Sequence, residues 1–233
     1  MYLHADDIGL SKVCNEVVFN LLQQKKLKSI SILANARYVD EVCKRLIKIR
    51  DVPFFLHLNL IEGYAVSDPK KIPTLVKKNG EFYSRNALII RLLLRQVDLG
   101  HLQIELDAQL LKLKELNVRI SGIDSHQHVH ALSPISEIVA RVVQSHHRLK
   151  VRQLSQMKTH SLNGRFKLTL LKLLSAFTYF IYYQKIGLPV SWRKKKWREY
   201  SVASWERFTK LDVVKDECVV VHPGLPYDKT KFV

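Results

Sequence analysis

The chain has 233 residues, of which nearly half are apolar and a quarter are charged, and it contains only eight glycines and seven prolines. This composition excludes a disordered or collagen-like chain, and the length suits one α/β domain with a substantial core. The 38 lysines and arginines against 21 acids give a net charge of +17, which favours anionic partners such as phosphates, nucleic acid or an anionic lipid surface. A basic but otherwise ordinary enzyme fits this charge equally well.

The cysteines and the first residues bear on the cellular compartment. Cys14, Cys43 and Cys218 are far apart and odd in number, which predicts buried thiols in a reducing environment. The opening MYLHADD reaches two acids within seven residues and does not resemble an apolar leader. We therefore expect a cytoplasmic protein.

Short β-like runs alternate with amphipathic stretches along the chain, without a repeat of fixed length. This alternation predicts a parallel sheet or barrel in a single domain, residues 1–233. The predicted strands are Tyr2–Ala5, Ser29–Ala34, Phe54–Leu60, Arg119–Asp124, Leu149–Arg152 and Cys218–Val221. The predicted helices are Lys12–Gln24, Val39–Arg50, Asn86–Asp98, Leu102–Leu116 and one ending near Ser145, for which Ser133 is the expected N-cap and Pro134 the first residue.

A strongly apolar stretch near the C-terminus, Leu168–Tyr183, is followed by the basic cluster Arg193–Arg198. The stretch is short for a membrane span and Lys172 interrupts it, so a buried or groove-lining helix is the preferred interpretation. Trp192 and Trp197 flank three lysines and leave an interfacial membrane helix as the alternative.

Three polar clusters lie where predicted strands end. They are Asp6 with Asp7, His57 with Asn59, and the group Asp124, His126, His128 and His130. The carboxyl ends of parallel barrel strands converge on one mouth, so clusters distant in sequence can meet there. A carboxylate and two imidazoles suit a catalytic Zn²⁺ or a related divalent ion, and a second carboxylate can act as general base for an attacking water.

The clusters also have simpler structural explanations. Adjacent acids such as Asp6 and Asp7 can merely cap the next helix, although Ser11 could begin that helix instead. The run IDSHQHVH, residues 123–130, places its acid and three histidines on one face only if the extended conformation persists.

Single histidines are weaker signals than clusters. His128 and His130, taken singly, are expected to support ligands or to face the substrate. His222 follows a β-like run and precedes a Pro-Gly turn, so at a barrel mouth it could be an acid or a substrate contact.

Four sequence blocks, taken together, resemble one known family. HADDIGLS with Asn15 just after it, HLNLIEG, IDSHQHVH and the closing HPG are similar, in the same order and over nearly the whole chain, to the YdjC-like carbohydrate deacetylases, which include the chito-oligosaccharide deacetylases. The resemblance implies a distorted, TIM-like (β/α) barrel and a hydrolase that removes acetyl groups from N-acetylated sugars.

The same resemblance implies roles for individual residues. One divalent metal ion, Mg²⁺ or Zn²⁺, would be held by Asp7, His57 and His126, with Asp6 as the catalytic base. The residues implied around the substrate are Asp124, His128, His130 and His222. From their positions after strands, we also take His222 as a second catalytic candidate and Asn59 as a substrate-binding candidate.

The sequence departs from the family pattern in three respects. His4 stands where an asparagine is usual, and fewer residues precede the first block and follow the last one, so the expected barrel is incomplete at its termini. The strong apolar stretch and the positive charge indicate a substrate at or near a membrane, such as a glycolipid, and a homodimer is a further expectation.

Two other functions compete with an active deacetylase. The first is a catalytically silent, truncated relative that keeps a metal and carbohydrate groove. The second is a nucleic-acid-binding protein driven by net charge, but the chain carries none of the motifs typical of that class, so we expect no nucleic-acid partner.

Overall fold

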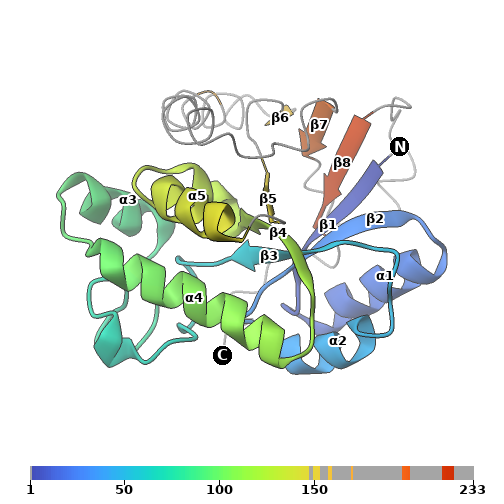
Figure 1. Ribbon diagram of the computed structural model, residues 1–233, viewed down its shortest axis with the longest axis horizontal. Coiled ribbons are helices and arrows are strands. Elements are labelled where there is room, and N and C mark those ends of the chain that lie inside the picture. Colours follow the sequence, from blue (N-terminus) through green and yellow to red (C-terminus); the bar gives the residue numbers. More distant parts are fainter. Residues whose placement is uncertain are drawn as a thin grey trace.

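An eight-stranded sheet runs through the centre of the molecule in the computed structural model, which describes residues 2–146, 149–152, 157–158, 169, 196–199 and 217–222 (Figure 1). The strands are β1 (Tyr2–Ile8), β2 (Leu27–Ile32), β3 (Phe54–Leu58), β4 (Ile120–Ser125), β5 (Lys150–Val151), β6 (Met157–Lys158), β7 (Lys196–Glu199) and β8 (Glu217–Val221). Their order is β5-β4-β3-β2-β1-β8-β7-β6, and all neighbouring strands run parallel.

This strand order is the cyclic order of a (β/α) barrel, because β1 lies between β2 and β8 and the numbers run consecutively on either side. Among the described residues, no pairing joins β5 to β6. The predicted α/β fold with a parallel sheet of barrel type is confirmed.

Helices connect the successive strands from β1 to β5 and pack on the outside of the sheet (Figure 1). They are α1 (Lys12–Gln23), α2 (Val39–Leu46), α3 (Arg85–Leu93), α4 (Leu99–Glu115) and α5 (Ile135–Ser145), with the 3₁₀ turns η1 (Pro69–Lys71) and η2 (His126–Ala131). Ser11 caps α1 by accepting a hydrogen bond from the backbone N–H of Cys14 at 3.1 Å. Asp6 and Asp7 are therefore not needed as caps and lie within β1.

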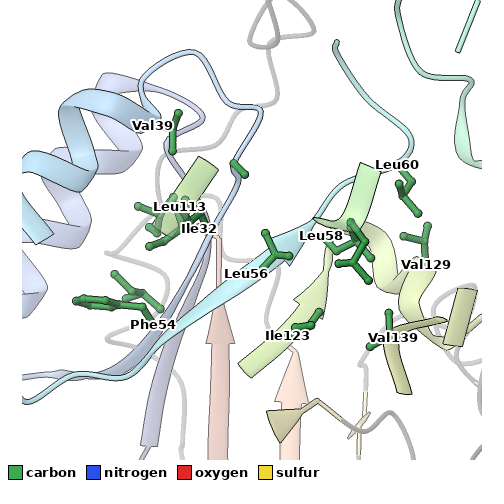
Figure 2. Packing of buried hydrophobic residues seen from close by; sticks show 14 of the residues in the cluster. Ile32, Val39, Phe54, Leu56, Leu58, Leu60, Leu113, Ile123, Val129 and Val139 are labelled. Carbon is green, nitrogen blue, oxygen red and sulfur yellow. The ribbon is translucent and has the colours of Figure 1, made fainter. Parts of the chain in front are cut away.

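The apolar core lies between the sheet and the helices (Figure 2). Strand β3 is buried along its whole length, as expected for the interior of a parallel sheet, and Leu56 packs beside Ile123 of the neighbouring β4. Gly122 allows these two strands their close packing, since a Cβ at that position would lie only 2.4 Å from Cε1 of Phe55.

Several predicted elements differ from the structure at their ends. Helix α2 ends at Leu46, four residues before the predicted end, and α3 ends at Leu93. The N-cap position of α5 is Pro134, so the prediction that Ser133 caps this helix is wrong. The first turn of α5 is held instead by backbone carbonyls, as in the hydrogen bond from Ser136 N–H to the oxygen of Leu132.

The extended conformation of the IDSHQHVH run does not persist. Strand β4 ends at Ser125, and the chain turns into η2 with left-handed backbone at Gln127 (φ 49°) and His128 (φ 61°). The acid and three histidines therefore do not share one strand face.

The C-terminal part contains two strands that the sequence did not predict, β6 and β7, and β7 overlaps the basic cluster Arg193–Arg198. The apolar stretch Leu168–Tyr183 lies outside the described residues, apart from Thr169. No helix in the described part of the chain has both the length and the apolar character needed to cross a bilayer.

Candidate metal centre

A bend near the end of β1 brings two neighbouring acids to the same centre. In a regular strand Asp6 and Asp7 would point to opposite faces. Here the register with β2 shifts between Ala5 and Ile8, and Asp7 has a left-handed backbone conformation with φ of 61°. Both carboxylates consequently lie buried at the carboxyl end of the sheet.

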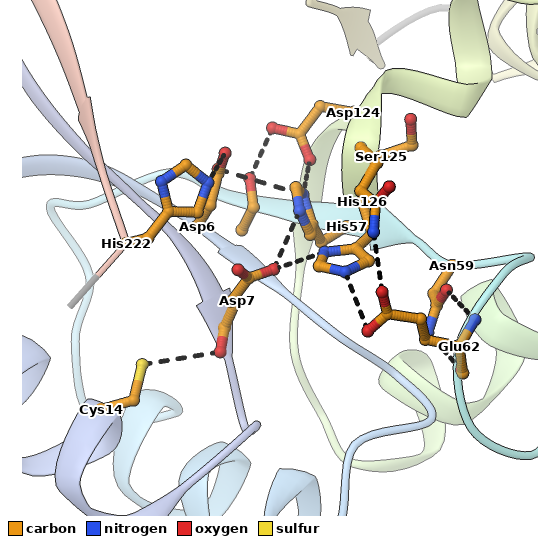
Figure 3. A network of polar contacts seen from close by, with 12 residues as sticks. Asp6, Asp7, Cys14, His57, Asn59, Glu62, Asp124, Ser125, His126 and His222 are labelled. Atoms are coloured by element: carbon orange, nitrogen blue, oxygen red, sulfur yellow. Dashed lines mark hydrogen bonds and ion pairs between the residues drawn. The ribbon is translucent and has the colours of Figure 1, made fainter. Parts of the chain in front are cut away.

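Asp7 meets one histidine from β3 and one from the start of η2 (Figure 3). Its Oδ1 lies 3.3 Å from Nε2 of His57 and 2.8 Å from Nδ1 of His126. One ligand atom from each of the three residues lies within 4.8 Å of the others. The other carboxylate oxygen of Asp7, Oδ2, is buried and has no hydrogen-bond partner among the described residues. A buried carboxylate oxygen without a partner, beside two imidazole nitrogens, fits a divalent cation.

Two further carboxylates contact the far nitrogens of these histidine rings (Figure 3). Asp124 Oδ1 accepts from Nδ1 of His57 at 2.6 Å, and Glu62 Oε2 lies 3.4 Å from Nε2 of His126. Each ring thus has one nitrogen toward Asp7 and the other toward an outer acid. This arrangement is common around protein metal ions, where the outer acid fixes the orientation of the ring.

The acids also set the protonation of the two imidazoles. Burial lowers the pKa of His57, but the nearby charges of Asp6 and Asp124 outweigh this effect and raise it to about 10. Burial likewise lowers the pKa of His126, whereas Asp7 raises it to about 9. The centre without an ion is therefore expected to carry both rings protonated at neutral pH.

A second buried cluster adjoins the first and is neutralised by an arginine. Arg152, which follows β5, donates from Nη1 to Asp6 Oδ2 at 2.8 Å and from Nη2 to Asp6 Oδ1 at 2.6 Å. The same Nη2 lies 2.5 Å from Asp124 Oδ2, and it also contacts His4. His4, Asp6 and Asp124 could by spacing alone hold a cation, but the guanidinium already bridges both acids, so the Asp7 cluster is the better metal centre.

Asp6 remains ionised despite its burial. Burial raises its pKa, but Arg152 and then His57 attract the charged form more strongly, so that the net pKa lies well below the usual value. His222 Nε2 lies 3.7 Å from Asp6 Oδ2, and its side chain is 17% exposed. The predicted catalytic pair therefore lies together, with His222 on the more accessible side.

The four residues predicted around the substrate occupy different environments. Asp124 is fully buried and accepts from Ser31 Oγ at 2.6 Å in addition to its contacts with His57 and Arg152. Asn59 is buried as well, and its side chain holds the loop that carries Glu62 by bonding both the N–H and the carbonyl of that residue.

His130 is buried and His128 is half-buried. The His130 ring contacts Ser125 Oγ at 2.6 Å and the backbone oxygen of Arg152 at 2.9 Å. Burial, followed by the repulsion from His128, lowers the pKa of His130 to about 4, so this ring is neutral. Of the four predicted residues, His128 is the one with a partly accessible side chain.

Sequence reasoning missed three residues of this centre: Arg152, Glu62 and Gln127, whose amide donates to Glu62 Oε1 at 2.7 Å. Glu62 stands in the HLNLIEG block three residues after Asn59, and this position after a strand was an available signal. Arg152 was the last residue of a predicted strand, where a buried position for a charged side chain is a second signal.

Comparison with known protein families matches residues 1–232 to the family described as YdjC-like protein. Curated relatives are named carbohydrate deacetylase. The relative from Thermoanaerobacter pseudethanolicus is 31% identical over 135 residues, covering 58% of this chain and 53% of that protein. The relative from Danio rerio is 30% identical over 142 residues, covering 59% and 44%. The one from Homo sapiens is 28% identical over 144 residues, covering 61% and 44%. The chain spans about half the length of the curated relatives it matches.

The fold also resembles a crystal structure from Enterococcus faecalis V583, whose proposed role is cellobiose-phosphate cleavage. The TM-score is 0.65 with 16% sequence identity, and the match covers 97% of this chain and 81% of that one. At this identity the likeness is one of fold.

Proposed function

Because the chain belongs to the YdjC-like family, we propose that it is a metal-dependent hydrolase that removes the acetyl group from an N-acetylated sugar. The substrate would be an oligosaccharide or glycolipid that contains N-acetylglucosamine. The observation that carries the proposal is the buried cluster of Asp7, His57 and His126, in which one carboxylate oxygen has no described partner. The relatives named carbohydrate deacetylase support the same chemistry.

In this proposal Asp7, His57 and His126 would hold one divalent ion, Mg²⁺ or Zn²⁺. Such an ion supplies Lewis-acid chemistry, since it polarises a carbonyl oxygen and makes water more acidic. Asp124 and Glu62 keep the two imidazoles in the orientation that ligation requires.

Asp6 would act as the general base that takes a proton from the attacking water. Arg152 holds the Asp6 carboxylate by two hydrogen bonds and keeps it charged. His222, which is close to Asp6 and partly exposed, would give a proton to the departing amine. The products are acetate and a free amino sugar.

In this proposal, the solvent exposure of each side chain decides whether it can contact the substrate directly. His128, half-buried at the edge of the centre, would contact the sugar directly. Asn59, Asp124 and His130 are buried, so they would affect binding through the residues that they hold in place.

The test is acetate release from N-acetylglucosamine oligosaccharides by purified protein supplied with Mg²⁺ or Zn²⁺, with the bound metal measured by elemental analysis. We expect release to depend on metal and to be lost in Asp6→Asn and His126→Ala. Asp51→Asn, an exposed acid away from the centre, is the matched control and should keep full activity.

Two results would reject the enzymatic proposal. One is metal-replete protein that releases no acetate from oligosaccharide or glycolipid; bound metal in that case would favour the catalytically silent relative. The other is release that Asp6→Asn and His126→Ala leave unchanged.

A further inference from the structure

The connection between β3 and α4 is a basic insertion of residues 63–97, which contains η1 and α3. It carries seven basic residues against two acids, for a net charge of +5: Lys70, Lys71, Lys77, Lys78, Arg85, Arg91 and Arg95 against Asp68 and Glu81. The insertion begins directly after Glu62, which contacts His126 of the candidate metal centre. A concentrated positive charge therefore lies on the segment next to that centre.

Helix α3 of this insertion presents an apolar ridge to solvent. Ile90, Leu93 and Leu94 are 55%, 77% and 61% exposed, and Leu93 is the most exposed large hydrophobic side chain in the described part of the chain. Their spacing of three and four residues places them on one face of the helix. The opposite face is packed on the core through the fully buried Leu88. Leu88 already packs α3 on the core, so the exposed ridge is not needed for that packing.

The ridge is held in place by specific contacts. Ser84 caps α3, and the guanidinium of Arg91 stacks over the ring of Tyr83 at 4.4 Å. The insertion is also tied to α4, because Glu105 accepts hydrogen bonds from the backbone N–H groups of Val66 and Ser67 at 3.0 Å. The exposed leucines are therefore carried by a fixed support, and α3 lies at one edge of the molecule, on the opposite side from α1 and α2 (Figure 1).

We propose that the 63–97 insertion docks on an anionic lipid bilayer, with Ile90, Leu93 and Leu94 entering the interface and the exposed cations of the insertion facing the headgroups. These cations are Lys70, Lys71, Lys77, Lys78 and Arg95. Peripheral membrane segments combine an apolar face of this kind with flanking positive charge. A second copy of the chain fits less well, since a symmetric contact would bring two +5 insertions together. The inference is independent of the proposed deacetylation and of the apolar stretch near the C-terminus.

The experiment is co-sedimentation of the full chain with vesicles of phosphatidylcholine alone or mixed with phosphatidylglycerol. We expect binding to the mixed vesicles, weakening as salt is added. The double variant Leu93→Glu with Leu94→Glu should lower the partition coefficient about tenfold or more, because apolar contact is lost and acids face an anionic surface. Val13→Glu, a matched change at a 64% exposed site on α1, should bind like wild type.

A second variant separates the charge contribution from any effect on folding. Lys70 and Lys71 are exposed on η1, and their joint replacement by glutamate should also weaken binding to the mixed vesicles. Circular dichroism should show wild-type helix content for all variants.

The inference is overturned if wild type does not bind mixed vesicles, or if the leucine double variant binds as tightly as wild type. It is also overturned if the wild type does not bind vesicles and light scattering shows a wild-type dimer that becomes a monomer in the double variant. In that case a second copy of the chain covers the ridge.

Discussion

Replacement of Arg152 by methionine tests the charge balance of the buried acids. The side chains of Arg152, Asp6 and Asp124 are 2%, 2% and 0% exposed, and one guanidinium contacts both carboxylates. Methionine keeps much of the volume but leaves Asp6 and Asp124 without the guanidinium that bridges them. Removal of one partner from such a buried ion pair costs about 3–5 kcal/mol. We expect a loss of this size in the free energy of unfolding of the metal-free protein at neutral pH.

The assay is urea unfolding of wild type and Arg152→Met in the presence of a chelator, with Arg45→Met as control. Arg45 pairs with Glu16 at the surface, where the two side chains are 39% and 65% exposed, so its replacement should have a much smaller effect. A loss in Arg152→Met no larger than that of the control would refute the reasoning.

The pH dependence gives an independent check on the Arg152 prediction. The pKa values of Asp6 and Asp124 are both lowered in the folded protein, because the charges of Arg152 and His57 and the hydrogen bonds to the carboxylates together outweigh the effect of burial. The stabilisation is therefore fully present above the unfolded pKa of about 3.9 and is lost as pH falls through the lower folded values. The difference between wild type and Arg152→Met should shrink in acid, and growth of that difference would contradict the argument.

Two further predictions concern the candidate metal centre. Glu62→Gln should weaken metal affinity about 10- to 100-fold, since Glu62 faces the far nitrogen of His126. The control Glu81→Gln, at a surface ion pair with Lys77, should leave the affinity unchanged. Calorimetric titration with Zn²⁺ measures both affinities, and equal values would exclude a positioning role for Glu62. The pKa values of His57 and His126 are raised to about 10 and 9, so binding of the ion at neutral pH should release about two protons. Calorimetry would detect this release as binding heats that differ between buffers of different ionisation enthalpy. Binding without proton release would contradict those pKa values. In the metal-free protein the same imidazoles stabilise the fold below their unfolded pKa of about 6.5, and this stabilisation should be lost as pH rises through 9 to 10.

The main elements and the central residues could be predicted because they follow simple periodic rules. Parallel strands align their carboxyl ends, so polar residues after Ala5, Leu56 and Ile123 were expected to meet, and Asp7, His57 and His126 do lie together. The convergence of the strand ends does not depend on where the helices end, so errors of several residues in the predicted helix ends did not affect it.

The parts that were missed depend on local backbone geometry or on distant partners. Gln127 and His128 adopt left-handed conformations without being glycine, so no residue type signalled the turn that ends β4. Arg152 pairs with Asp6 across 146 positions of sequence, and no periodic pattern links them. Strand β7 was missed because KWRE lacks the apolar alternation on which strand prediction relies.

The bend at Asp7 limits how the ion preference of the candidate metal centre could be redesigned. A backbone φ of 61° is tolerated well by glycine, asparagine and aspartate and costs other residues roughly 1–2 kcal/mol. Libraries that exchange Asp7 for glutamate or cysteine would therefore lose folding free energy, whatever the effect on coordination. Selection for a different metal should consequently yield substitutions at positions 57 and 126 more readily than at position 7.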